Sequence, residues 1–271
     1  MATRRRPFQA VKPIGDSQCE LGIRSALVDT CVFRIAEFAR SVLKEERVES
    51  RGITSYVKIL GHRRTGPYDE NKEAAIRALP TIARLSREGR LRLFRSSEIE
   101  GEDFSGRLLG GTTVDLFAEA QFSWAHDPIQ RWRFQQCAEF HTKALRTRFC
   151  EWLLSLTPEE VGRLKSMPKL SDFEIKGLES VHRFREICRH LPEKHYVDAL
   201  HLWTAEMNGM DFFLTTDAKF IRAIKHSSAK LTILSEPISP TDVLNRLGIA
   251  SLDPLPISDH DFHYLFGDAK R

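Results

Sequence analysis

The 271-residue sequence has no apolar run near the roughly 18–20 residues that a membrane-spanning helix needs, which excludes such a helix. The basic segment Met1 to Arg6 is not followed by an apolar stretch, so we expect no secretory signal. Five cysteines are scattered along the chain, and no Cys-x-x-Cys pair occurs. This pattern favours reduced thiols in a cytoplasmic protein over disulfides or a zinc site.

Two further absences reduce the range of possible functions. No glycine-rich loop with a lysine is present, so nucleotide hydrolysis of the P-loop kind is not expected. His141, His182 and His195 lack the close spacing of a zinc site, so we do not expect a metal bound through histidine. Lys and Arg number 41 and Asp and Glu number 37, a net charge of +4 that is too small to establish a nucleic-acid partner.

Apolar strands alternate with helices in the first and last thirds of the chain. Strands are expected at residues 23–28, 91–94, 212–215 and 231–234, with 53–59 ambiguous. Helices are expected at residues 35–43, 70–88, 193–207, 218–225 and 240–248. This alternation predicts an α/β fold with a central parallel sheet and helices on both faces.

The middle of the chain has a different pattern. Residues 105–190 show helical spacing and little strand signal, with capping boxes at Thr157–Glu160 and Ser171–Glu174. We therefore expect a helical insertion in an α/β domain. The predicted organisation is a basic arm at 1–22, the domain at 23–104 and 191–250, the insertion at 105–190 and a tail at 251–271.

Acidic residues follow the predicted strands. Asp29 and Asp217 each come directly after one, and Asp198 lies early on the helix before the Asp217 strand. A cluster follows another strand: Glu98, Glu100, Glu102 and Asp103. The carboxyl ends of parallel strands share one rim, where converging carboxylates repel each other unless a cation joins them.

Hard ions such as Mg²⁺ or Mn²⁺ suit an all-oxygen site and can activate a water for phosphodiester hydrolysis. The alternative for Asp29 or Asp217 taken alone is a helix N-cap.

Three segments resemble the PIN-domain ribonucleases. Residues 26–33, ALVDTCVF, are similar to the family's opening motif, an apolar strand ending in Asp, then Thr or Ser, then usually Asn, where this chain has Cys31. Residues 195–220, HYVDALHLWTAEMNGMDFFLTTDAKF, resemble the family's second half, and 234–248 its C-terminus. The resemblance covers residues 23–50, 90–104 and 193–248.

The resemblance implies a three-layer α/β/α fold and a metal-dependent endoribonuclease that leaves a 5′-phosphate and a 3′-hydroxyl. Asp29, Asp198 and Asp217 would hold Mg²⁺ or Mn²⁺, with Thr30 and Thr216 orienting the ligands. The middle acid would be Glu102, with Glu98 the main alternative ligand and Glu100 or Asp103 also open.

The same resemblance implies the partners of the protein. RNA is the expected substrate, with single-stranded DNA as a second one, and family members often form homodimers or pair with an antitoxin-like protein. Basic residues beside aromatics are candidates for contacting nucleic acid, the other interpretation being solvated helix faces: Arg131, Arg133, Arg146 and Arg148. The alternative function is a catalytically inactive PIN-like module that binds nucleic acid or a protein partner.

Overall fold

The computed structural model describes residues 23–50, 53–66, 68–106, 113–134, 142–227, 231–257 and 261–264. The predicted basic arm at 1–22 lies outside these residues. Within the described part of the chain, no helix is both long enough and apolar enough to cross a membrane.

A sheet of five parallel strands forms the centre of the molecule. It contains β1 (Arg24–Val28), β4 (Leu91–Arg95), β6 (Phe122–Trp124), β7 (Phe212–Leu214) and β8 (Glu236–Ile238), in the order β6-β4-β1-β7-β8. The predicted α/β fold with a central parallel sheet is confirmed. Counted in chain order, these strands lie 3-2-1-4-5 across the sheet, so the order reverses between β1 and β7.

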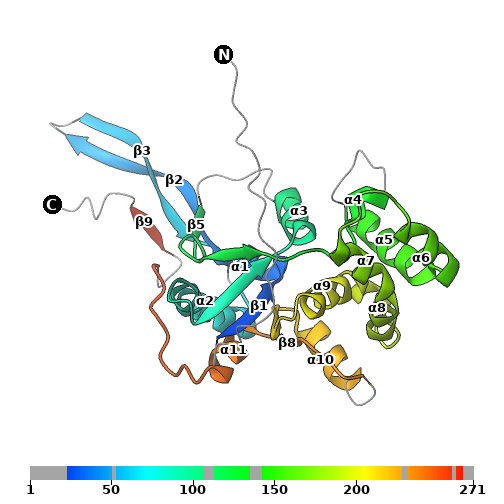
Figure 1. Ribbon diagram of the computed structural model, residues 1–271. Coiled ribbons are helices and arrows are strands. Elements are labelled where there is room, and N and C mark those ends of the chain that lie inside the picture. Colours follow the sequence, from blue (N-terminus) through cyan, green and yellow to red (C-terminus); the bar gives the residue numbers. More distant parts are fainter. Residues whose placement is uncertain are drawn as a thin grey trace.

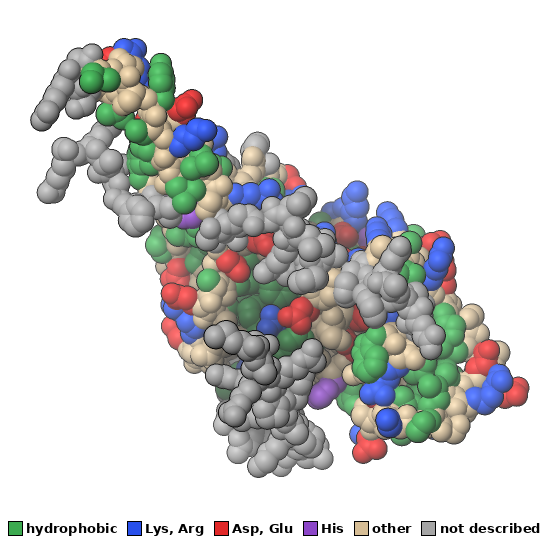
Figure 2. Space-filling model, turned by 90° about the horizontal axis from the view of Figure 1, so that it is seen from above, with side chains coloured by type: hydrophobic (Ala, Val, Ile, Leu, Met, Phe, Trp, Pro, Cys, Tyr) green, Lys and Arg blue, Asp and Glu red, His purple; other side chains and the backbone are tan. Residues whose placement is uncertain are grey.

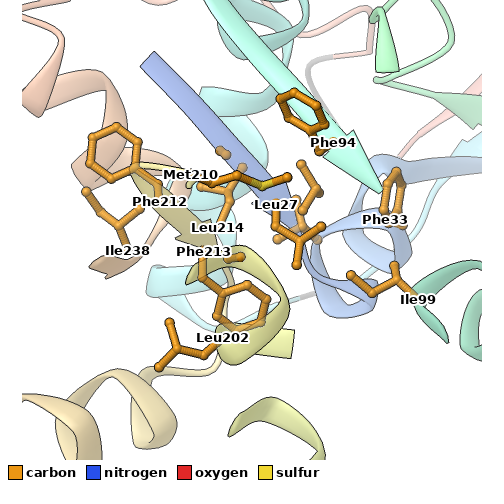
Figure 3. Close-up of a cluster of buried hydrophobic side chains, with 14 of the residues drawn as sticks. Leu27, Phe33, Phe94, Ile99, Leu202, Met210, Phe212, Phe213, Leu214 and Ile238 are labelled. Atoms are coloured by element: carbon orange, nitrogen blue, oxygen red, sulfur yellow. The ribbon is translucent and has the colours of Figure 1, made fainter. Parts of the chain in front are cut away.

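Helices cover both faces of this sheet. Figure 1 shows α2 (Glu70–Arg87) and α11 (Pro240–Arg246) on one side, and α9 (Tyr196–Met207) backed by α5 (Lys143–Ser155) and α8 (Val181–Cys188) on the other. A strand enclosed on both faces is apolar throughout, and Ala26, Leu27 and Val28 are completely buried. Leu27 lies among side chains from β7 and α9 in the core (Figure 3).

The helix limits follow local signals. The remaining helices are α1 (Thr30–Ala36), α3 (Ser97–Gly106), α4 (Arg131–Phe134), α6 (Pro158–Lys165), α7 (Asp172–Glu179), the 3₁₀ helix η1 (Glu193–His195) and α10 (Ala218–Ser227). Both predicted capping boxes are confirmed at the starts of α6 and α7. Gly89 follows α2 with a φ of 69°, in the left-handed region that favours glycine at helix ends.

A second, antiparallel sheet forms an arm that projects from the body (Figure 1). Its order is β5 (Thr113–Asp115), β2 (Glu37–Ser50), β3 (Ile53–Arg64) and β9 (Phe262–Tyr264). The predicted helix at 35–43 is wrong, because α1 ends at Ala36 and the chain then pairs with β3 over twelve residue pairs. Figure 2 shows hydrophobic side chains exposed along the arm. Leu43 of β2 and Tyr56 of β3 are both exposed.

Three other expectations are corrected. The segment 105–190 contains two strands: β6 joins the edge of the central sheet, and β5 joins the arm. The last strand of the central sheet is at 236–238 rather than 231–234, with Pro237 in an edge position where its missing N–H is tolerated. The predicted tail contributes β9 to the arm, and its Asp253 pairs with Arg84 of α2.

Candidate metal centre

The two acids that follow neighbouring strands meet where the strand order reverses. Asp29 comes directly after β1, and Asp217 comes three residues after β7, which lies beside β1. Ligands bind to open α/β sheets in the crevice outside such a reversal, because connections leave the two strands in opposite directions. The fold therefore places the predicted acids at the expected binding crevice.

Asp29 is buried at the end of β1. Its side chain makes no cap hydrogen bond to α1 and is only 6% exposed. Its Oδ2 accepts hydrogen bonds from the Thr215 hydroxyl at 2.7 Å and the Cys31 thiol at 2.8 Å. Burial, reinforced by the charge of Asp29, raises the pKa of the Cys31 thiol, which therefore stays protonated and able to donate. Asp29 occupies the N-cap position of α1, as the N-cap alternative predicted, but its side chain makes no capping hydrogen bond.

Asp217 has two roles because its two carboxylate oxygens point to different partners. Oδ1 accepts hydrogen bonds from the backbone N–H groups of Lys219 at 2.8 Å and Phe220 at 2.9 Å, which caps α10. The N-cap alternative is therefore confirmed for this residue. Oδ2 lies 4.0 Å from Nδ1 of His195 and belongs to the crevice.

Asp198 and His195 complete a compact cluster. His195 ends η1 and Asp198 lies in the first turn of α9, with His195 Nδ1 2.9 Å from Asp198 Oδ2. One ligand atom from each of His195, Asp198 and Asp217 lies within 4.8 Å of the other two. His195 thus lies among the possible ligand residues, and the expectation that no metal is bound through histidine stays a prediction. The position of His195 three residues before Asp198, on the same helical face, was the available signal.

The electrostatics of the cluster suit a divalent cation. Burial and the nearby charge of Asp29 raise the pKa of Asp198 to about 6. Such a shift means that the ionised carboxylate is poorly stabilised by the protein alone. Carboxylate oxygens are the ligands that Mg²⁺ and Mn²⁺ prefer, and an imidazole beside them is compatible with Mn²⁺. The residues present therefore fit a divalent ion at Asp198 and Asp217 beside His195, with Asp29 near enough for its charge to raise the pKa of Asp198.

Glu102 reaches the same cavity from α3. Thr30 donates a hydrogen bond to its Oε2 at 3.1 Å, Arg146 lies 3.3 Å from Oε1, and Nε2 of His201 lies 3.6 Å from Oε2. Burial opposes ionisation of Glu102, but these neighbours outweigh it and lower its pKa to about 2. Thr30 thus orients an acid, as the sequence suggested, and His201 is a partner that the sequence did not reveal.

The other acids of the predicted cluster lie elsewhere. Glu98 forms a buried ion pair with Arg131 at 3.0 Å, so these two residues neutralise each other away from the cavity. Glu100 is exposed and lies 3.7 Å from Arg95. The side chain of Asp103 lies outside the described residues. The structure therefore favours Glu102 and removes Glu98 as a ligand.

Two more predicted roles change. Thr215, rather than Thr216, supplies the hydroxyl that binds Asp29, whereas Thr216 contributes its backbone N–H to Cys31 at 3.1 Å. Among the arginines expected to contact nucleic acid, Arg131 is buried against Glu98 and Arg133 pairs with Glu174 at 2.9 Å. Of the four arginines predicted to contact nucleic acid, Arg146 lines the acidic cavity.

The fourth arginine, Arg148, is exposed on α5. No ion pair involves it within the described part of the chain.

The acids lie in a cavity of about 440 Å³ with a basic rim. The acidic side is formed by Glu102, Asp198 and Asp217 together with His195, and the cationic lining residues are Arg34, Lys143, Arg146, Lys194 and Lys219. Arg34 and Arg146 pair with Glu102. Among the described residues, Lys143, Lys194 and Lys219 have no carboxylate within 4.0 Å, so their charges are available to a ligand.

Comparisons with protein-family models, with curated proteins and with solved structures found no match to this chain.

Proposed function

We propose that this protein is a metal-dependent endoribonuclease of the PIN type that cleaves RNA, with single-stranded DNA as a second substrate. The observation that carries the proposal is an acidic cluster at the strand-order reversal, enclosed by lysines that lack acidic partners. Cleavage of RNA needs both features: a cation at the scissile phosphate, and positive charge that binds the flanking phosphates.

The residues divide into three roles. Asp29, Asp198 and Asp217 would hold Mg²⁺ or Mn²⁺, which when bound would lower the pKa of a water and stabilise the charge of the phosphoryl group. His195 holds the carboxylate of Asp198 at 2.9 Å, and Thr215 holds that of Asp29. These contacts fix the carboxylates before the substrate arrives.

The lysine rim would bind and orient the substrate. Lys143 lies at the start of α5, Lys194 in η1 and Lys219 at the start of α10, so three separate elements surround the acids. Each lysine can neutralise one phosphate without losing an intramolecular ion pair. The helical insertion thus contributes directly to the cavity through Lys143 and Arg146 of α5.

The test is cleavage of a single-stranded RNA by the purified protein with Mn²⁺. We expect cleavage that chelation abolishes and that Asp198→Asn reduces at least a hundredfold, because an amide removes a ligand charge. Asp172→Asn is the matched control, because Asp172 is exposed on α7 and does not line the cavity. No cleavage by the wild-type protein, or full activity in Asp198→Asn, would contradict the proposal.

A further inference from the structure

A second hollow, of about 820 Å³, adjoins the acidic cavity. Asp217 and Lys219 line both spaces, so the boundary between them is the first turn of α10. The hollow lies between α10 and the N-terminal parts of α2 and α11. A single-stranded RNA bound across the acidic cavity can therefore continue over Lys219 into this hollow.

The walls of the hollow combine apolar surface with neutral polar groups. Ala74, Ala75 and Ala218 contribute small apolar side chains, and Ile221 adds a larger one. Asn71 and Thr241 supply neutral hydrogen-bonding groups. This combination suits a flat nucleobase, whose faces are apolar and whose edges carry donors and acceptors.

The charges within the hollow also suit a nucleotide. Asp69 accepts a hydrogen bond from the backbone of Lys72 and caps α2, while Asp242 accepts one from the Ser239 hydroxyl at 2.8 Å. These acids are engaged within their own helix starts. Arg222 is exposed, and no ion pair engages it within the described residues, so its guanidinium is available for a phosphate.

Two basic residues of α10 lie along the boundary between the acidic cavity and the second hollow. Lys219 and Arg222 are three residues apart and therefore lie on the same side of the helix, about one turn from each other. Lys219 borders both hollows and Arg222 only the second. The two cations thus mark a path that leads away from the acids.

We infer that this hollow binds the unpaired nucleotide next to the scissile phosphate, with the base against Ala74 and Ala218 and a phosphate beside Arg222. The inference rests on the proposed nuclease function and adds a subsite to it. A volume of about 820 Å³ lies within the roughly 300–1,000 Å³ typical of small-molecule sites, enough for one nucleotide.

The test compares two substrates. Bis(p-nitrophenyl) phosphate is a diester without a base, so its hydrolysis with Mn²⁺ reports on the acidic cavity. A single-stranded RNA oligomer reports on both spaces. We expect Ala74→Trp, which fills the hollow from an exposed position, and Arg222→Gln to lower the ratio of kcat/KM for RNA to kcat/KM for the diester about tenfold.

Arg77→Gln is the control, because Arg77 is exposed on α2 and lines neither hollow. It should leave the ratio unchanged. An unchanged ratio in Ala74→Trp and Arg222→Gln, with both substrates cleaved, overturns the subsite alone. A wild-type protein that cleaves neither substrate overturns the proposed function and the subsite with it.

Discussion

The hydroxyl of Thr215 donates a hydrogen bond of 2.7 Å to the carboxylate of Asp29, although 186 residues separate them in the chain. Both groups are buried at the ends of adjacent strands, and the Cys31 thiol lies 3.2 Å from the same hydroxyl. A buried carboxylate needs such donors, since water cannot replace them. Thr215 thus fixes a proposed metal ligand through the packing of β1 against β7.

Replacing this hydroxyl should weaken metal binding. Thr215→Val keeps the shape of the side chain but removes the donor to Asp29. We expect Mn²⁺ affinity to fall several-fold and the free energy of unfolding to fall by about 1–2 kcal/mol. Calorimetric titration and urea denaturation measure the two effects. Thr216→Val is the matched control, because only the backbone of Thr216 bonds to Cys31. Equal effects in the two variants would remove Thr215 from the site.

The pair formed by Glu102 and His201 should stabilise the fold. His201 is 1% exposed, and its ring nitrogens have no hydrogen-bond partner among the described residues, which leaves Glu102 at 3.6 Å as its counter-charge. Burial alone would lower the pKa of His201, but Glu102 raises it. Glu102→Gln should therefore lower the free energy of unfolding at pH 7 by about 3 kcal/mol.

Lowering the pH toward 2 should abolish the difference in the free energy of unfolding between the wild type and Glu102→Gln. The pKa of Glu102 is lowered from 4.5 to about 2, so the stability it contributes is complete above pH 4.5 and is lost as the pH falls toward 2. Urea denaturation of the wild type and Glu102→Gln at several pH values measures the change. Glu100→Gln, at an exposed position, should change stability by less than about 0.5 kcal/mol. A difference that is independent of pH would show that Glu102 is not ionised in the fold.

Metal affinity should depend on pH near neutrality. Burial and Asp29 raise the pKa of Asp198 to about 6, and a protonated carboxyl is a poor ligand. We expect Mn²⁺ affinity to rise between pH 5 and pH 7, with proton release on binding near pH 6. Calorimetry in buffers of different ionisation enthalpy measures the released protons. Affinity that is flat across this range would argue against Asp198 as a ligand.

The structural features that depend on neighbouring residues along the chain were predicted correctly from the sequence. The uniformly apolar segment 26–28 indicated a strand covered on both faces, and Thr157 and Ser171 marked helix starts correctly. The acids after strands were also found, because parallel strands end at one rim. These features follow from local composition and from the general geometry of α/β sheets.

The errors share one physical cause, which is pairing between distant segments. Apolar residues at 35–43 have helical spacing, yet pairing with 53–64 makes this segment a strand. Glu98 and Arg131 are 33 residues apart, and nothing in their local sequences shows that they neutralise each other. The same holds for Thr215, whose hydroxyl bonds to Asp29, 186 residues away in the chain.

One glycine should be required by close packing. A Cβ at Gly177 of α7 would collide with the backbone carbonyl of Pro128, which cannot move aside as a flexible side chain can. Gly177→Ala should therefore lower the free energy of unfolding by about 1–3 kcal/mol. Gly162 of α6 has nothing within 4 Å of an added Cβ, so Gly162→Ala should raise stability by about 0.5–1 kcal/mol. Thermal denaturation of both variants checks the opposite signs, and destabilisation of equal size would refute the packing argument.

The central claim is that Asp29, Asp198 and Asp217 form a site for a divalent cation, and calorimetric titration of the full-length protein with Mn²⁺ at pH 7.5 tests it most directly. We predict saturable binding in the wild type and in Asp172→Asn, and a loss of at least tenfold in affinity in Asp198→Asn and Asp217→Asn. Absence of saturable binding in the wild type, or equal affinity in all four proteins, would contradict the account.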